Sequence, residues 1–122
     1  RHTSYSLSIA SSKKTNKECA AAKRYIDANY KTNITLDTLA GITHMNKYYL
    51  VHAFRNFTGL SPINYLIARR IDESKALLQS TDYSISEISE IIGFSSPSYF
   101  SQAFKKSVSL SPNDYRKKVK QP

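Results

Sequence analysis

Two stretches of the chain, MNKYYLVHAF from Met45 and GFSSPSYFSQAF from Gly93, carry polar and aromatic side chains at helical spacing. In each stretch, apolar residues recur every three or four positions and leave the remaining side chains on the opposite face of a helix. Glutamine can pair with adenine, serine can bond to several base edges, and lysine or arginine can read guanine or neutralise phosphate. These faces therefore predict contacts with DNA bases from Lys47, Tyr48, Val51 and His52 on the first and from Pro97, Ser98, Ser101 and Gln102 on the second.

Further basic residues follow on the same segments and near the end of the chain. The candidates for phosphate contacts are Arg55, Lys105, Lys106, Arg116 and Lys117. Any one of these candidates alone is more typical of an ordinary solvated surface. Their coincidence on two matching faces is what indicates DNA binding.

The overall charge agrees with a nucleic-acid partner. Eighteen Lys and Arg stand against nine Asp and Glu, which gives a formal charge of +9 over 122 residues. Such a surplus favours a polyanion, and double-stranded DNA is the partner we expect. A basic protein without such a partner and a binder of anionic membrane surfaces are the alternatives, and charge does not decide among them. No apolar run approaches the ~20 residues that cross a bilayer, so no membrane segment is expected.

Enzyme chemistry has little support in the sequence. Gly41, Gly59 and Gly93 are isolated, so no phosphate-cradling loop is present. The histidines at positions 2, 44 and 52 lack metal-ligand spacing, and Cys19 has no evident base nearby in the sequence. We therefore predict no catalysis, no metal and no cofactor. One cysteine cannot form an internal disulfide, which is typical of a reducing compartment.

The elements that would position these faces are all predicted to be helices. Residues 1–16 are rich in Ser, Thr and Lys, which indicates a linker or the end of an upstream domain, and an amphipathic helix follows from Lys17 to about Asn29. No segment shows the strict alternation of a strand, so the expected fold class is all-α with about seven helices. Caps and proline starts place the later helices after Thr35, Asn46, Ser61, Ser84, Ser96 and Ser111, with ends near Ile42, Gly59, Gln79, Gly93 and Tyr115.

The chain also repeats itself, which predicts two helix-turn-helix units. On the second helix of the first unit, Leu50, Ala53, Phe54 and Phe57 are expected to face inward. A helix of ~27 Å joins the units, and successive major-groove faces lie ~34 Å apart. Once the width of each unit is included, this length allows the second helix of each unit to enter a successive groove. Duplication that only builds a bundle core is the alternative. The predicted parts are a first unit at 17–60, a linker helix at 61–80 and a second unit at 81–122. At an offset of 50, Phe54, Leu60, Ser61, Pro62 and Tyr65 match Phe104, Leu110, Ser111, Pro112 and Tyr115.

A set of apolar, glycine, proline and basic positions extends over both halves of the chain. It comprises Leu39, Ala40, Leu50, Phe54, Gly59, Ser61, Pro62, Tyr65, Arg69 and Ala76–Leu78 in the first half and Ile88, Gly93, Phe94, Ser98, Phe100, Phe104, Lys105, Pro112, Tyr115 and Arg116 in the second. In this pattern, residues 18–118 resemble the DNA-binding domain of the AraC/XylS family of bacterial transcription regulators. Val51 and His52 depart from the polar or arginine residues common in that family, which favours apolar contact with thymine methyl groups. Ser109 replaces a frequent glycine, where a left-handed backbone would be strained.

The resemblance implies two recognition helices in adjacent major grooves and regulation of bacterial transcription, with activation expected. It also implies a cytoplasmic location, RNA polymerase as a partner, and a separate effector or dimerisation domain that this chain does not show. Two other classes of function stay open at this point. They are a basic DNA binder without sequence preference and a protein-interaction module.

Overall fold

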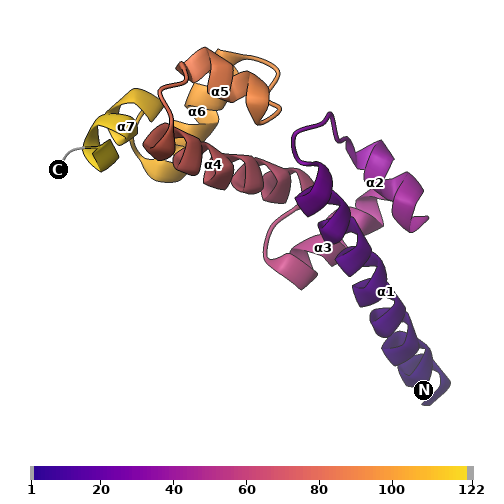
Figure 1. Ribbon diagram of the computed structural model, residues 1–122. Coiled ribbons are helices and arrows are strands. Elements are labelled where there is room, and N and C mark those ends of the chain that lie inside the picture. Colours follow the sequence, from indigo (N-terminus) through magenta and orange to yellow (C-terminus); the bar gives the residue numbers. More distant parts are fainter. Residues whose placement is uncertain (1, 121–122) are drawn as a thin grey trace. The chain divides into compact units, whose positions relative to one another are not determined.

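The described part of the chain forms seven helices and contains no strand. The computed structural model describes the backbone of residues 2–120 and the side chains of residues 13–120. The all-α fold class expected from the sequence is confirmed. The helices are α1 (His2–Asn29), α2 (Leu36–Thr43), α3 (Lys47–Thr58), α4 (Pro62–Ser80), α5 (Ile85–Ile91), α6 (Pro97–Val108) and α7 (Pro112–Lys120) (Figure 1).

Side-chain caps fix the starts of the short helices. Thr35 and Ser84 each accept a hydrogen bond from the backbone three residues on, and each forms a reciprocal capping box. Asn46 and Ser96 cap α3 and α6 in the same way, without the reciprocal bond. These caps satisfy N–H groups that have no partner inside the helix, so the predicted starts after all four residues are confirmed.

Two helices are longer than the sequence pattern indicated. Helix α1 begins at His2 instead of Lys17. The segment contains neither glycine nor proline, and lysine is a good helix former, so no residue type there stops the helix. Helix α7 continues past Tyr115 to Lys120, whose ammonium donates to the Thr81 carbonyl at 2.8 Å.

The described chain divides into two compact units. The first extends through Asn29 and over Ile34–Tyr65. The second comprises Tyr30–Asn33 and the residues from Leu66 onward. The division into subdomains at 17–60 and 81–122 that the repeat suggests stays a prediction.

In the first unit, α1 packs against both α2 and α3 (Figure 1). One side of α1 supplies Cys19 and Ile26 to the core, and both are fully buried. Leu39 from α2 and Leu50 and Phe54 from α3 complete this core, again with no exposed surface. The core thus holds α2 and α3 as a pair on the longer helix.

The core of the second unit contains several aromatic rings. Ile71 and Leu78 of α4 lie with Phe94, Phe100 and Phe104 in one buried cluster. Phe104 contacts Phe100 at 5.9 Å between ring centroids and Tyr115 of α7 at 5.4 Å, both edge to face. This geometry is favourable for aromatic pairs. The cluster therefore fixes α6 against α7.

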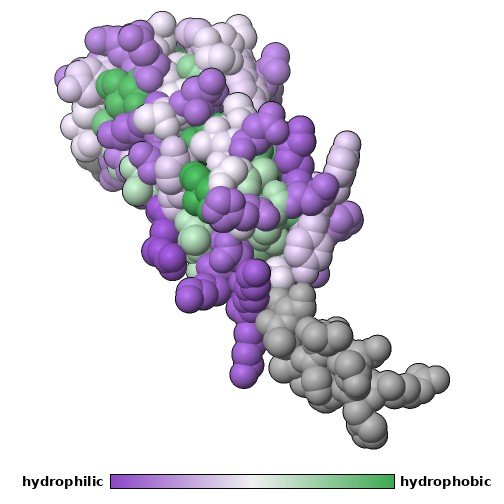
Figure 2. Space-filling view, turned by 90° about the vertical axis from the view of Figure 1, so that its right-hand side faces the viewer, coloured by the Kyte–Doolittle hydropathy of each residue, from purple (hydrophilic) through white to green (hydrophobic). Residues whose placement is uncertain are grey.

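Not every apolar residue of the helical stripes is buried. Phe57, expected to face inward, is 39% exposed, so this prediction is wrong. Its angular position on α3 matches that of Leu50, so its exposure reflects its place in the last turn of the helix. Ile42 and Ile91, near the ends of α2 and α5, are exposed as well. On the face shown in Figure 2, hydrophobic residues form small patches among hydrophilic ones, and no described helix is long and apolar enough to cross a membrane.

Candidate nucleic-acid interface

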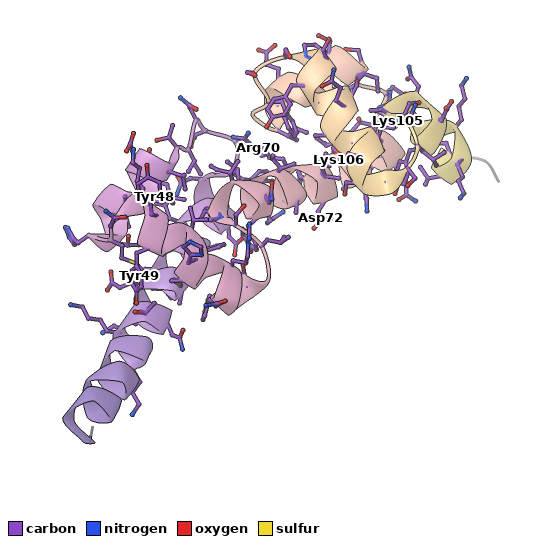
Figure 3. All side chains as sticks on the ribbon, turned by 180° about the vertical axis from the view of Figure 1, so that it is seen from behind. Tyr48, Tyr49, Arg70, Asp72, Lys105 and Lys106 are labelled. Carbon is purple, nitrogen blue, oxygen red and sulfur yellow. The ribbon has the colours of Figure 1, made fainter. Side chains whose placement is uncertain are left out.

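Helix α3 separates an apolar face from a polar one. Leu50, Ala53 and Phe54 are buried. The predicted base-reading residues of this helix lie elsewhere on its surface, with Tyr48 78% exposed and Val51 half-buried. Figure 3 shows the labelled Tyr48 and Tyr49 on this helix. The other polar candidates, Lys47, His52 and Arg55, are also exposed.

A hollow of about 310 Å³ lies beside the start of α3. It is lined by Lys47, Tyr48 and Val51 of α3 and by Leu36 and Asp37 of α2. The structure thus brings together three of the four first-helix candidates. The hollow offers an ammonium, a phenol and aliphatic surface, which suit phosphate, base edges and thymine methyl groups respectively.

Helix α6 repeats this arrangement in the second unit. Ser96 caps the helix and Pro97 occupies its first turn, where a missing N–H leaves no bond unmade. Phe100 and Phe104 are buried, whereas Pro97, Ser98 and Gln102 are exposed. The fourth candidate, Ser101, is half-buried, and Lys105 and Lys106 extend from the last turn of the same helix (Figure 3).

The turn before α6 is built on close backbone packing. Gly93 has a φ of 94°, and a Cβ at this position would lie 2.8 Å from the carbonyl oxygen of Lys31. Phe94, the next residue, contacts Tyr99 edge to face, with ring centroids 5.1 Å apart. Glycine is therefore needed here for both conformation and space.

Arg70 holds the backbone that faces this turn. Its guanidinium donates to the carbonyl of Tyr30 at 2.7 Å and to that of Thr32 at 2.8 Å, and it lies 5.5 Å from the ring centroid of Phe94. The side chain is buried, and this burial lowers the pKa of Arg70 from its usual value. Two carbonyls and an aromatic face compensate for the desolvation of the cation.

The phosphate candidates near the chain end differ in their surroundings. Arg116 is half-buried, and its guanidinium donates to the carbonyls of Leu78 and Thr81 at 3.1 and 3.3 Å. It therefore binds backbone at the end of α4 in this structure. Lys117 is exposed. The phosphate roles of both residues stay predictions.

Two residues at the first recognition helix, Asp37 of α2 and Tyr49 of α3 itself, were not among the candidates chosen from the sequence. Asp37 contacts Lys47, with 3.1 Å between carboxylate and ammonium. Tyr49 exchanges a hydrogen bond of 3.0 Å with Thr15 of α1. Asp37 lies one helix earlier, and the sequence signal that could have identified it is that it is the only Asp or Glu between Asp27 and Asp72.

Within the described residues, no group of three or more His, Cys, Asp or Glu side chains is placed to hold a metal ion. Cys19 is buried in the first unit, and burial raises the pKa of its thiol. A raised pKa disfavours the reactive thiolate.

Known proteins share this arrangement. A family model described as a helix-turn-helix domain matches residues 39–118. The HTH-type transcriptional regulator YdiP of Escherichia coli K12, which is uncharacterized, is 38% identical over 96 residues, which are 79% of this chain and 32% of that protein. The chain thus spans about a third of the length of this curated relative.

Two solved structures extend the comparison. The C-terminal domain of AraT, a response regulator from Geobacillus stearothermophilus, has a TM-score of 0.78 at 33% identity, covering 83% of this chain and 84% of that one. The DNA-binding domain of AdpA, solved with a target DNA, has a TM-score of 0.78 at 28% identity, with 82% and 90% covered. The repeated helix-turn-helix architecture and these matches show that the chain belongs to the AraC-type family of helix-turn-helix transcriptional regulators.

Proposed function

We propose that this chain binds double-stranded DNA sequence-specifically, with α3 and α6 in successive major grooves, and thereby regulates bacterial transcription. The observation that carries the proposal is the repeated pair of capped helices, each exposing a mixed polar and apolar face. A major groove admits one α-helix and presents a distinct donor and acceptor pattern for each base pair. The AdpA domain, a similar structure, was solved with its target DNA, which supports the same role for this chain.

The individual residues have separate proposed roles. Gln102, exposed on α6, is suited to adenine, and Val51, at the edge of the hollow beside α3, is suited to a thymine methyl group. Lys105 and Lys106 supply charge for phosphates. A surface of this kind binds any duplex through phosphates and selects one through base contacts.

The rest of the proposed biology concerns the intact protein. We propose that it works in the cytoplasm as an activator that contacts RNA polymerase, and that a separate domain senses an effector or dimerises. A similar structure is described as the xylose-binding transcription activator XylR, of which this chain covers 26%. That proportion leaves room for a sensing domain outside the matched part.

We further propose that this part of the protein is not an enzyme. A relative from Bacillus subtilis, 30% identical, is named a bifunctional transcriptional activator and DNA repair enzyme, and this chain spans 46% of it. DNA selectivity without catalysis is the function that the exposed helix faces support here.

The first test is selection of bound duplexes from a random DNA pool with the purified chain at near-physiological salt. We expect a bipartite site whose two boxes lie about one helical turn apart. Uniform recovery would contradict sequence-specific binding by this chain, and no recovery would contradict DNA binding itself.

A pair of variants then separates base reading from phosphate binding. Gln102→Ala is expected to weaken the selected site by ~1 to 3 kcal/mol and to relax preference at one position. Lys105→Ala is its matched control on the same helix and should weaken all duplexes similarly. If the binding profile of Gln102→Ala equals that of the wild type, Gln102 does not read a base.

A further inference from the structure

Lys47 occupies an unfavourable position in its helix. It is the first residue of α3, where the helix carries partial positive charge, so a cation there is destabilising. Its ammonium lies 3.1 Å from a carboxylate oxygen of Asp37, the second residue of α2. A negative side chain is favourable at that end of α2. Asp37 thus compensates locally for a charge that the helix itself does not favour.

The ion pair lies within the surface proposed to contact DNA. Asp37 and Lys47 line the same hollow as Tyr48 and Val51. Both partners remain accessible, with 79% of the Asp37 side chain and 50% of the Lys47 side chain exposed. A DNA strand that reaches Tyr48 therefore also meets this carboxylate.

The repeated fold does not require the pair. Ser86 and Pro97 occupy the equivalent positions of the second half, at offsets of 49 and 50, and neither residue carries charge. Helix α6 nevertheless begins at Pro97 and has the same length as α3, 12 residues. A charge pair that the fold can omit is a candidate for function.

We infer that Asp37 acts as an internal substitute for a DNA phosphate and sets the affinity of the first recognition helix. This inference rests on the proposed function. In the free protein the carboxylate holds the Lys47 ammonium. An exposed pair is weak, so a phosphate can displace the carboxylate. Binding then exchanges one ionic contact for another and leaves Asp37 close to the negatively charged backbone.

The exchange has a specific signature. The exchange assigns Lys47 to a phosphate and not to the base contact suggested by the sequence, so Asp37 lowers the affinity for every duplex by a similar factor. Lys47 is partly neutralised before binding, so fewer counterions are released from DNA when it arrives. Each neutralised phosphate contributes ~0.9 to the slope of log K against log salt concentration. Asp37 should make that slope shallower by up to about this amount.

The test compares the wild-type chain with Asp37→Asn on a duplex selected from the random pool and on a scrambled duplex, over a range of salt concentrations. Asn retains the size of the side chain and removes its charge. Asp72→Asn is the matched control, because Asp72 is an exposed carboxylate on α4 in the second unit (Figure 3). Asp37→Ser, which installs the residue type found at position 86, is a second variant in case Asn disturbs α2.

We expect Asp37→Asn and Asp37→Ser to bind both duplexes several-fold more tightly than the wild type, with a steeper salt dependence, and more tightly than Asp72→Asn. In the Lys47→Ala background the gain should disappear. Equal effects of the substitutions at Asp37 and Asp72 would overturn the inference, since net charge alone would then account for both. Weaker binding of the selected duplex only would also overturn it, because Asp37 would then read a base. Wild-type chain that binds neither duplex would contradict the proposed function itself.

Discussion

The two recognition helices end in the same backbone geometry, although a different residue closes each of them. Gly59 closes α3 with a φ of 91°, and its amide donates to the carbonyl of Arg55 at 2.8 Å. Ser109 closes α6 with a φ of 68° and donates to the carbonyl of Lys105 at the same distance. Glycine adopts this left-handed conformation without strain, whereas a residue with a Cβ does not. The shape of the turn is therefore kept in the second half at a higher local energy.

The loops that precede the two helix-turn-helix pairs show a second difference. Positions 70 and 120 are equivalent in the repeat, and both hold a basic residue that donates to loop carbonyls. Arg70 is 7% exposed, whereas Lys120 is exposed and also binds the Asp82 carboxylate. The first loop is thus held by a buried guanidinium, whereas the second is held by a solvated ammonium together with the half-buried guanidinium of Arg116. Two loops of similar shape can therefore depend on contacts that contribute differently to stability.

The largest difference is expected between the turn glycines. Gly93→Ala adds a Cβ 2.8 Å from the Lys31 carbonyl, whereas Gly59→Ala meets nothing within 4 Å. Both share the left-handed strain of ~1 to 2 kcal/mol, and overpacking should raise the loss for Gly93→Ala to roughly 2 to 5 kcal/mol. Urea unfolding of both variants measures the difference. Equal losses would mean that the backbone near Lys31 moves aside.

Removal of the charge should cost more stability at Arg70 than at Lys120. Arg70→Met removes a buried hydrogen bond to the Tyr30 carbonyl and a part-buried one to the Thr32 carbonyl, and we expect a loss of ~2 to 4 kcal/mol in the free energy of unfolding. Lys120→Met removes an exposed contact and should change it by less than about 1 kcal/mol. Chemical denaturation checks both values. A small effect of Arg70→Met would show that water replaces the guanidinium.

The closing residue of α6 offers a change in the opposite direction. Ser109→Gly should stabilise the protein by roughly 1 kcal/mol, because glycine relieves the strain at a φ of 68°. The gain is reduced by the greater freedom of glycine in the unfolded chain. Thermal unfolding followed by circular dichroism measures it. An unchanged or lowered midpoint would mean that the serine conformation is not strained.

The two capping boxes should respond differently to pH, and this is the smallest of the expected effects. The Glu87 carboxylate accepts a hydrogen bond of 2.9 Å from the Ser84 amide, and this bond lowers the pKa of Glu87. The corresponding acceptor in the first half is the neutral Thr38 hydroxyl. Because the pKa of Glu87 is lowered in the folded state, the stabilisation of the fold by this hydrogen bond is complete above the ordinary pKa of ~4.3. It is lost as pH falls through the pKa of the folded state.

NMR can follow this loss through the amide of Ser84, with the amide of Thr35 as the internal reference. We expect the Ser84 amide to shift in acid and the Thr35 amide to stay constant. Glu87→Gln keeps an acceptor in the capping box but does not titrate, so it should abolish the shift of Ser84. A titration that persists in Glu87→Gln would assign the shift to another group.

Local chemistry explains why much of the fold was predictable. Caps such as Asn46 and Ser96 and the stop at Gly59 act through their own side chain or backbone, so the sequence alone located them. The inward faces followed from helical spacing. Phe57 was misplaced because spacing gives the direction of a side chain but not whether another helix reaches that turn. The start of α1 was missed because Ser- and Lys-rich segments without glycine or proline are compatible with both linker and helix.

The candidate site was predictable in part. The exposed positions of Tyr48 and Gln102 followed from the burial of their neighbours on α3 and α6. The contacts of Asp37 and Arg70 could not be deduced, because each joins residues from different helices or loops. Such long-range partners depend on the tertiary arrangement. Roles in DNA binding remain predictions that the variants above can test.

The buried Cys19 makes the first unit its own reporter of opening. It is the only cysteine of the chain and has no exposed surface, so a thiol reagent can reach it only when α1 separates from the residues that cover it. Under conditions where reclosing is faster than labelling, the ratio of its labelling rate to that of a free thiol gives the equilibrium constant for opening. Cognate DNA should slow this labelling if binding stabilises the closed unit. The unmodified protein thus contains a chemical probe of its own local unfolding equilibrium.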